Sequence, residues 1–287
     1  MLRDLVEPLE LSSLIQRGSL AVVDCRFDLT RPQWGAEAYA AGHIPTAVYA
    51  NLDLDLSSPV SAQSGRHPLP SPEALAATLG RLGIDLNTPV VAYDQGNGAL
   101  AARLWWLARW VGHRQVAVLD GGFAAWQQEG LPVSAEPTVP ATKHFDARPD
   151  STKVVSTQAL SKMLAAGDFQ AGRLRLVDAR AADRFAGENE TLDPVSGHVP
   201  GARNHPFAGN VDDRGRFLAA AQLRNRWRET LGTIPPSNLI SMCGSGVTAC
   251  HNLLALELAG LPGARLYAGS WSEWIRDPAR AVATGPG

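Results

Sequence analysis

The sequence predicts an α/β protein made of two copies of one domain, each a parallel sheet with helices on both faces. Three observations predict it: the length of 287 residues, an internal repeat, and short apolar segments that alternate with amphipathic ones. A chain of this length with 45% apolar residues has room for two ordinary domains of about 140 residues each. Alternating strand and helix patterns are typical of a parallel sheet covered by helices.

The first half of the chain recurs in the second. Leu20–Arg26 and Leu174–Arg180 are both apolar runs that end in Asp-x-Arg, which is typical of a buried strand with polar residues at its carboxyl end. Two later pairs of segments share a constant offset, 237 − 89 = 269 − 121 = 148 residues. The paired segments are 20–26 with 174–180, 42–47 with 197–202, 89–98 with 237–246, and 119–126 with 267–274.

The order of elements follows from this repeat. The sequence predicts strands at 20–24, 89–93 and 116–119, and helices at 72–82 and 99–111. The segment 135–150 contains Pro137, Pro140 and Pro149 without an apolar period, so it reads as an exposed linker. We therefore expect an N-terminal domain at 1–134, a linker at 135–150 and a C-terminal domain at 151–287.

Composition argues against several classes of partner. The formal charge is −2 and no block of Lys or Arg occurs, so we expect no nucleic-acid partner. The first residues do not resemble a signal peptide, and no apolar run approaches the roughly 20 residues of a membrane span, so we expect a cytoplasmic protein without a membrane partner. Three cysteines without C-x-x-C spacing fit neither a disulfide framework nor a metal cluster, so we expect no metal and no cofactor.

One loop carries the features of a reactive cysteine. The segment 239–242 reads as a short strand, 243–248 as a turn, and 249–259 as a helix, so Cys243 begins a loop that leads into a helix N-terminus. Backbone amides at such a position favour the thiolate, which is the nucleophilic form. Gly244 and Gly246 allow the tight backbone that an anion cradle requires. The alternative is a small buried cysteine that only packs.

The first half weakens that alternative. Its matching turn keeps both glycines, Gly96 and Gly98, but has Gln95 where the second half has Cys243. We therefore expect the N-terminal copy to be catalytically silent. Cys250, about two helical turns after Cys243, reads as a core residue, as does Cys25.

The segment Cys243-Gly-Ser-Gly-Val-Thr-Ala-Cys250 resembles the active-site loop of the 3-mercaptopyruvate sulfurtransferases in the two-domain rhodanese family. The paired Gly-His-Ile/Val-Pro segments, the stretch 93–106 and the segment 269–274 also resemble that family. The resemblance implies two tandem rhodanese-like domains. It also implies that Cys243 takes sulfur from a small donor as a persulfide and passes it to cyanide, a small thiol or a thioredoxin-like protein.

The same resemblance suggests roles for the loop residues. Amides of Gly244, Gly246, Val247 and Thr248 would bind the donor and hold the anionic persulfide. Relatives that act mainly on thiosulfate carry cationic residues directly after the cysteine, whereas this chain has Gly244 and Ser245. We therefore expect 3-mercaptopyruvate as the donor, with thiosulfate:cyanide sulfurtransferase activity as the alternative.

Three residues are expected to assist Cys243. Arg184 occupies the position of the family's arginine that grips the donor carboxylate. Ser245 and His43 resemble the residues that relay a proton to the departing enolate, although the Gly-His context recurs at His198 and also fits a structural turn. A second arginine of some relatives should fall near residue 193, where this chain has Asp193. The acidic partner of the histidine is not placed.

Two further readings remain. A cysteine phosphatase of the same fold needs an arginine six residues after the nucleophile to hold phosphate, and residue 249 is Ala249, so we set it aside. A non-enzymatic carrier, whose cysteine accepts persulfide only from another protein, would have a reactive Cys243 that does not turn over small donors.

Overall fold

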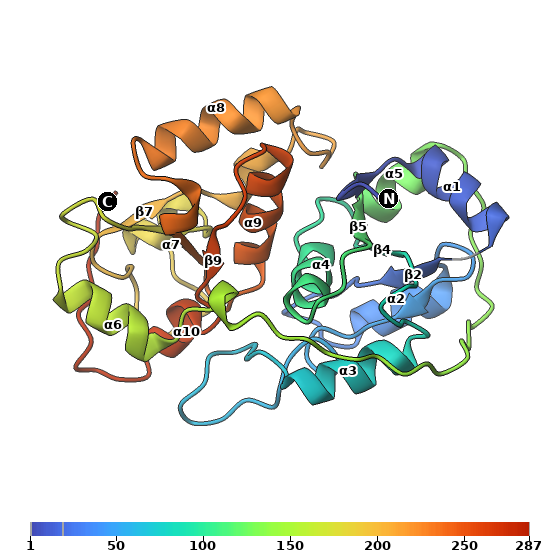
Figure 1. Cartoon of the computed structure of the whole chain (residues 1–287), viewed down its shortest axis with the longest axis horizontal. Helices are drawn as coiled ribbons and strands as arrows, with labels where there is room; N and C mark the ends of the chain where they lie inside the picture. Colours follow the sequence, from blue (N-terminus) through green and yellow to red (C-terminus); the bar gives the residue numbers. More distant parts are fainter. Residues whose placement is uncertain (1, 19, 287) are drawn as a thin grey trace. The chain divides into compact units, whose positions relative to one another are not determined.

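The chain folds into two compact units, each organised around a parallel sheet. The structure is a computed structural model that describes residues 2–18 and 20–286. Met1 and Gly287, the outermost residues of the predicted domains, and Ser19 lie outside the described residues. Figure 1 shows the strands of each unit flanked by helices.

Unit 1 comprises Met1–Ser58, Leu69–Asp150 and Val211–Phe217. Its five-stranded sheet has the order β1-β5-β4-β2-β3, with every neighbouring pair parallel. The strands are β1 (Leu5–Val6), β2 (Ala21–Asp24), β3 (Val48–Tyr49), β4 (Val90–Tyr93) and β5 (Val116–Leu119). The helices are α1 (Pro8–Arg17), α2 (Trp34–Ala41), α3 (Pro72–Arg81), α4 (Ala101–Trp110) and α5 (Gly122–Gln128).

Unit 2 comprises Pro59–Pro68, Ser151–Asn210 and Leu218–Gly287. Its four-stranded sheet has the order β7-β6-β8-β9 and is again parallel throughout. The strands are β6 (Arg175–Asp178), β7 (Ala202–Asn204), β8 (Leu239–Met242) and β9 (Arg265–Leu266). The helices are α6 (Thr157–Ala165), α7 (Ala182–Ala186), α8 (Ala220–Leu231), α9 (Thr248–Leu258) and α10 (Ser270–Trp274).

The second sheet repeats the first, which confirms the predicted fold class. The order β7-β6-β8-β9 matches β3-β2-β4-β5, so each strand of unit 2 has a counterpart in unit 1. The parallel bridge between Val154 and Leu266 stands where β1 pairs with β5. The predicted strands at 20–24, 89–93 and 116–119 are β2, β4 and β5, and the predicted helices at 72–82 and 99–111 are α3 and α4.

Parallel pairing brings the chemistry-bearing residues of unit 2 to one edge. β6 and β8 run side by side, and Asp178 is paired with Met242 at their carboxyl ends. The residues that follow these strands, Arg180 and Cys243, therefore emerge at the same edge of the sheet, where ligands of open parallel sheets bind. The equivalent pair in unit 1 is Asp24 with Tyr93.

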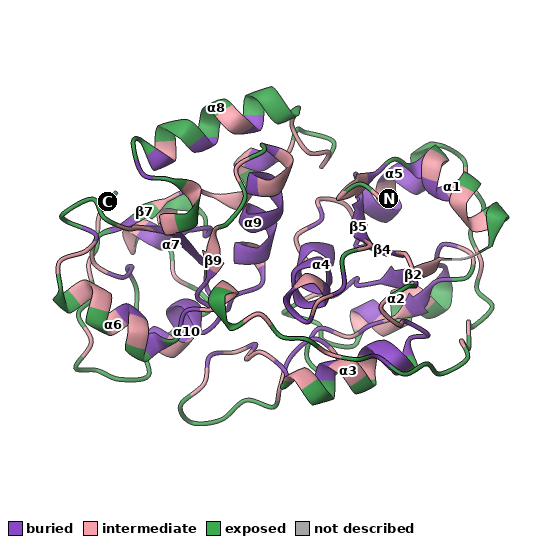
Figure 2. Cartoon of the chain, in the orientation of Figure 1, coloured by how far each residue is buried: buried purple, intermediate pink, exposed green. Residues whose placement is uncertain are grey.

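Each unit has its own apolar core. In unit 1 the core includes Val22, Val91 and Trp126, and in unit 2 it includes Leu176 and Trp271. The helix after each loop is buried along most of its length, α4 in unit 1 and α9 in unit 2, whereas α8 keeps an exposed face (Figure 2). The strands that carry the loops are thus held by packing on both sides.

The compact units are not the contiguous halves that the sequence predicts. The segment 59–68 comes from the first half of the sequence but belongs to unit 2, and the segment 211–217 comes from the second half but belongs to unit 1. The predicted linker at 135–150 also belongs to unit 1, where Phe145 is buried and the amides of Lys143 and Arg148 bond to Gly80 and Val111 carbonyls. Apolar periodicity does not reveal such segments, because they are held by hydrogen bonds and single side chains.

Within the described ranges, the structure contains no helix that is both long and apolar enough to cross a membrane.

Candidate active site

Cys243 lies at the start of the loop between β8 and α9, with its sulfur directed at loop amides. The Sγ atom is 3.1 Å from the amide nitrogen of Gly246 and 3.5 Å from that of Ser245. The residue is only 2% exposed. Two inward-pointing N–H groups at the sulfur favour a negative charge there, as the position before a helix N-terminus predicts.

The loop is held in this shape from α10. The Cys243 amide donates to the hydroxyl of Ser270 at 3.0 Å, and the Trp271 amide donates to the Cys243 carbonyl at 2.9 Å. Gly246 has φ 82°, and a Cβ there would lie 2.3 Å from the carbonyl oxygen of Ala268. Only glycine meets both requirements, so the loop conformation depends on it.

Several loop amides remain available for an anion. Gly244, Val247 and Thr248, three of the residues predicted to bind the donor, make no backbone N–H hydrogen bond within the described part of the chain. Val247 is the N-cap residue of α9 and Thr248 is its first residue, so their unsatisfied amides belong to a helix N-terminus. These donors lie in the same loop as the Cys243 sulfur, which is where the second sulfur of a persulfide would need them.

The equivalent loop of unit 1 holds a carboxylate in place of the sulfur. Asp94 accepts hydrogen bonds from the amides of Gly96 and Gly98 with one oxygen, and from those of Leu100 and Ala101 with the other, at 2.8–3.2 Å. Gly98, like Gly246, has a positive φ, 77°. The strand register places Asp94, and not Gln95 as the sequence suggested, at the position of Cys243. In unit 1 a side chain of the protein thus already occupies the anion cradle.

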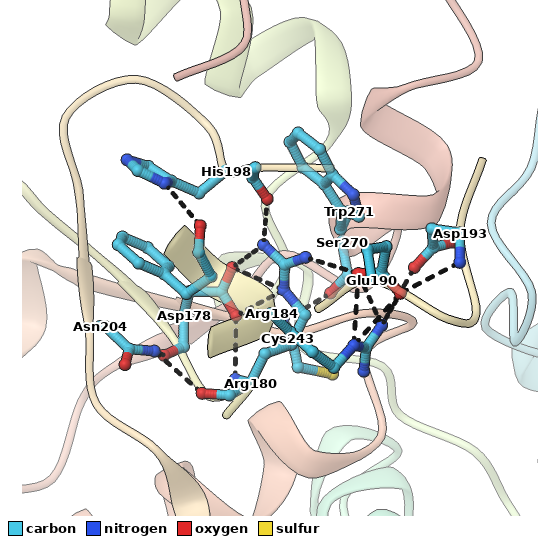
Figure 3. A network of polar contacts seen from close by, with 12 residues as sticks. Asp178, Arg180, Arg184, Glu190, Asp193, His198, Asn204, Cys243, Ser270 and Trp271 are labelled. Atoms are coloured by element: carbon cyan, nitrogen blue, oxygen red, sulfur yellow. Dashed lines mark hydrogen bonds and ion pairs between the residues drawn. The ribbon is translucent and has the colours of Figure 1, made fainter. Parts of the chain in front are cut away.

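Beside the Cys243 loop, three arginines and three carboxylates alternate in one chain of contacts, which we call the arginine network. Its members, in the order of contact, are Asp178, Arg180, Glu190, Arg184, Asp193 and Arg66. All six belong to unit 2. Figure 3 shows the labelled members and the sulfur of Cys243 in one view.

The first pair of the network has a structural role that both units share. Arg180 binds the Asp178 carboxylate and donates to the Gly197 carbonyl at 2.8 Å, and Arg26 does the same with Asp24 and Gly42 in unit 1. Burial works against the charge of Arg180, but Asp178, Glu190 and an ionised Cys243 outweigh it and raise its pKa. Arg180 thus adds positive potential at the sulfur.

Arg184, predicted to bind the donor carboxylate, is largely occupied by acids of its own unit. Its Nη2 lies 2.8 Å from Glu190 and 3.3 Å from Asp193. Burial opposes ionisation of Glu190, but hydrogen bonds from Arg184 and from the amides of Leu192 and Asp193 lower its pKa. Glu190 is therefore a buried anion that fixes the Arg184 guanidinium beside the loop.

The segment 59–68 brings two further side chains to the loop. Nδ1 of His67 lies 2.7 Å from the hydroxyl of Ser245, and both residues are buried. Arg66 forms an ion pair with Asp193, and its amide donates to the Ser272 hydroxyl at 3.0 Å. Unit 2 thus contains an imidazole and a serine hydroxyl in hydrogen-bond contact next to the cysteine, an arrangement suited to proton transfer.

His43, which we expected to relay the proton, does not have this position. It lies in unit 1, stacked on Tyr39 at 4.0 Å, with Nδ1 2.8 Å from the Tyr39 carbonyl and Nε2 3.1 Å from the Glu136 carbonyl. His198 repeats the arrangement in unit 2, stacked on Phe185 at 3.8 Å with Nδ1 2.9 Å from its carbonyl. The repeated histidine therefore stabilises a turn, and the structure places His67 at Ser245 instead.

The sequence held one signal for the missed residues. Gly65-Arg66-His67 recurs as Gly215-Arg216-Phe217, at an offset of 215 − 65 = 150 residues. The first triplet lies in the segment 59–68 of unit 2, and the second lies in the segment 211–217 of unit 1. The Phe217 ring lies beside Gly98, 3.2 Å from where a Cβ of that residue would be. A Gly-Arg-aromatic triplet therefore lies at each loop, with His67 at the Cys243 loop and Phe217 at the equivalent loop of unit 1.

The other cysteines are packed, and the described residues offer no metal centre. Cys25 is buried, and burial raises the pKa of its thiol well above the usual value, which makes it a poor nucleophile. Cys250 is also fully buried, with its Sγ 3.3 Å from the Gly246 carbonyl. No group of three or more His, Cys, Asp or Glu side chains that could hold a metal occurs among the described residues.

Comparison with known proteins assigns the family. The model of the rhodanese-like domain matches residues 7–129 and 156–277. A Pseudomonas aeruginosa protein named "Probable 3-mercaptopyruvate sulfurtransferase" is 48% identical over 278 residues, 96% of each chain. A Gallus gallus protein named "Thiosulfate sulfurtransferase" is 36% identical over 281 residues, 95% of this chain and 93% of that protein.

Solved structures agree with the sequence relatives. A crystal structure from Escherichia coli, described as a 3-mercaptopyruvate sulfotransferase, superposes with a TM-score of 0.80 at 30% identity and covers 94% of this chain and 99% of that one. Both domains match, and the relatives extend over nearly the whole chain. This chain therefore belongs to the rhodanese family, as one of its two-domain sulfurtransferases.

Proposed function

We propose that this chain transfers sulfur from 3-mercaptopyruvate through a persulfide on Cys243, with release of pyruvate. The observation that carries the proposal is the buried Cys243 sulfur in an amide cradle, with the Ser245–His67 pair in the same loop region. The 48% identity with a relative named for this activity supports the choice of donor. Gly244 directly after the cysteine also favours a donor other than a small dianion.

In the first step the Cys243 thiolate attacks the sulfur of the donor. A new S–S bond forms, the C–S bond of mercaptopyruvate breaks, and its electron pair leaves with the carbon as the enolate of pyruvate. The enolate carbon takes a proton and becomes the methyl group of pyruvate. We assign the proton relay to Ser245 and His67, because a hydroxyl and an imidazole 2.7 Å apart can pass a proton from the donor's S–H group to that carbon.

In the second step an acceptor nucleophile attacks the outer sulfur of the persulfide. The S–S bond breaks, its electrons return to Cys243 as the thiolate, and the acceptor leaves with the sulfur. Cyanide, a small thiol or a reduced thioredoxin-like protein fits this chemistry. Until that attack the loop amides hold the persulfide anion, as an oxyanion hole holds oxygen.

Thiosulfate is the second candidate donor. The relative named for thiosulfate supports this donor, and the guanidinium groups beside the loop fit an anion. Its transfer would release sulfite and need no proton on carbon, so it would not depend on the Ser245–His67 pair.

The test compares the two donors with cyanide as acceptor, in the wild-type chain and in Cys243→Ser. We expect pyruvate and thiocyanate from mercaptopyruvate, a slower rate from thiosulfate, and no turnover by the serine variant. Turnover by Cys243→Ser would rule out the proposed nucleophile. A wild-type chain that turns over neither donor, yet accepts persulfide from a protein donor, would favour the carrier.

A further inference from the structure

Arg66 is the one member of the arginine network that comes from the segment 59–68. We propose that Arg66 binds the donor, and that its guanidinium supplies a cation to the donor's carboxylate above Gly244. The proposal rests on the donor chemistry proposed for Cys243 and adds a residue that selects anionic donors. Three observations carry it: the place of the guanidinium, its free hydrogen-bonding capacity, and the charge balance around it.

The place of the guanidinium is defined by Gly244. A Cβ built on Gly244 would lie 2.9 Å from Nη2 of Arg66 and 3.7 Å from Nη2 of Arg184. The Arg66 head group therefore stands where a side chain at position 244 would begin, one residue after the nucleophile. In the relatives that act on thiosulfate, a side chain directly after the cysteine supplies a cation. In this chain Arg66, from the segment 59–68, supplies the cation at that place.

The free capacity separates Arg66 from the other two arginines. Arg184 donates to both oxygens of Glu190 and to Asp193, and Arg180 donates to Asp178, Glu190 and the Gly197 carbonyl. The Arg66 side chain donates only through Nη1, to Asp193, within the described part of the chain. It is also the most exposed, 28% against 19% for Arg184 and 1% for Arg180.

Asp193 positions the Arg66 guanidinium through Nη1 and leaves its other N–H groups for a ligand. Its side chain is 1% exposed, with one oxygen on Arg66 and the other on Nη2 of Arg184, so it links the two guanidiniums. Burial raises the pKa of Asp193, with the two arginines acting against that rise. A second arginine was expected near residue 193. The chain has Asp193 there, and its carboxylate holds Arg66 from the segment 59–68.

The distribution of charge also favours Arg66, which lies at one end of the arginine network. Three arginines face three carboxylates, and the two inner arginines, Arg180 and Arg184, each contact two of those carboxylates. Arg66 lies at the end of the series and contacts one. An incoming carboxylate gains most by pairing with the arginine that keeps N–H groups unused, since a guanidinium can bind two acceptors side by side.

The test uses two alkylating reagents that attack the same thiolate and differ in charge. Iodoacetate carries a carboxylate and iodoacetamide a neutral amide, so the ratio of their rates with Cys243 reports a nearby cation and requires no sulfur transfer. We expect this ratio, referred to that of free cysteine, to fall about tenfold in Arg66→Gln, from the loss of one unit charge near the sulfur. Arg66→Lys keeps the positive charge, so its ratio should lie between those of the wild type and Arg66→Gln.

Arg228→Gln is the matched control, because Arg228 is an exposed residue on α8 outside the network and the same charge is removed. The ratio of Arg228→Gln should stay within about twofold of the wild-type ratio. Arg66→Met serves as a second neutral variant if the glutamine variant does not fold. An unchanged ratio in a folded neutral variant overturns the proposal, and so does an equal fall in Arg228→Gln. Neither result depends on whether mercaptopyruvate is the donor.

The same variants give a second readout in turnover. With mercaptopyruvate, Arg66→Gln should raise KM about tenfold and change kcat little, because the carboxylate is bound similarly before and during the reaction. A fall in kcat at constant KM would contradict a binding role.

Discussion

At the scale of single residues, the same amino acid has different roles according to what surrounds it. His43 and His198 occupy repeated turns and contact the carbonyls of Tyr39 and Phe185, whereas His67 contacts the hydroxyl of Ser245. A histidine that faces backbone carbonyls stabilises a turn. A histidine that faces a hydroxyl beside a nucleophile can exchange a proton with it.

This difference predicts opposite results for two substitutions. His67→Asn should slow single-turnover release of pyruvate from mercaptopyruvate about a hundredfold, because the enolate loses its proton relay. Transfer from a preformed persulfide to cyanide should change little, since that step protonates no carbon. His43→Asn should lower the melting temperature and leave pyruvate release intact. Equal losses of pyruvate release in the two variants would contradict the assignment.

At the scale of elements, a strand, a loop and a helix follow one another in both units, and the loop amides face a different side chain in each unit. In unit 2 the amide of Gly246 meets the sulfur of Cys243, and in unit 1 the amide of Gly98 meets the carboxylate of Asp94. Asp94, the residue directly after β4, stands where Cys243 follows β8, and Gln95 is one residue further on. Unit 1 therefore has a carboxylate in place of the nucleophile, and this carboxylate takes the amides that a persulfide would need.

This register predicts that a cysteine placed at Gln95, beside the Asp94 carboxylate, does not become reactive. In a Cys243→Ser background, Gln95→Cys should form less than about 1% of the wild-type persulfide after exposure to mercaptopyruvate, because the adjacent carboxylate repels an anion and the amides are occupied. Mass spectrometry of the peptide that contains position 95 measures this. Persulfide at that position at wild-type levels would show that the amide cradle is not required.

At the scale of the whole molecule, two units with separate cores allow the stability of unit 2 to depend on its own buried groups. His205 is buried in unit 2, stacked on Trp227 at 3.8 Å and hydrogen-bonded to Thr230 and Asn210. Burial lowers the pKa of His205 from 6.5 to about 4, although the hydrogen bond with Asn210 acts in the other direction. The folded state therefore binds this proton less tightly than the unfolded chain.

The sign of the effect follows from that difference. Above about pH 6.5 neither state is protonated at His205, and between about pH 6.5 and 4 only the unfolded state is, so unit 2 loses stability as the pH falls. At pH 5 this loss amounts to roughly 2 kcal/mol. Urea unfolding at pH 7 and pH 5 measures it. His205→Gln should reduce the pH dependence by about that amount, and substitution of the exposed His144 should not.

Patterns in the amino-acid sequence were sufficient to predict the duplicated α/β fold, the family, and the loop at Cys243. These properties reside in patterns between near neighbours: apolar strands, Gly-containing turns, and the order of the paired segments. The outcome agrees closely, since β2, β4, β5, α3 and α4 lie within one or two residues of their predicted positions.

The side chains that lie near Cys243 could be identified only from the folded chain. His67 and Arg66 lie more than a hundred residues before Cys243, in a segment without apolar period, and they reach unit 2 because hydrogen bonds to Ser272 and Ser245 and an ion pair with Asp193 hold the segment there. Such contacts depend on the path of the backbone and not on local pattern. For that reason the family resemblance suggested His43, although its motif recurs at His198, whereas the structure shows His67 in contact with Ser245.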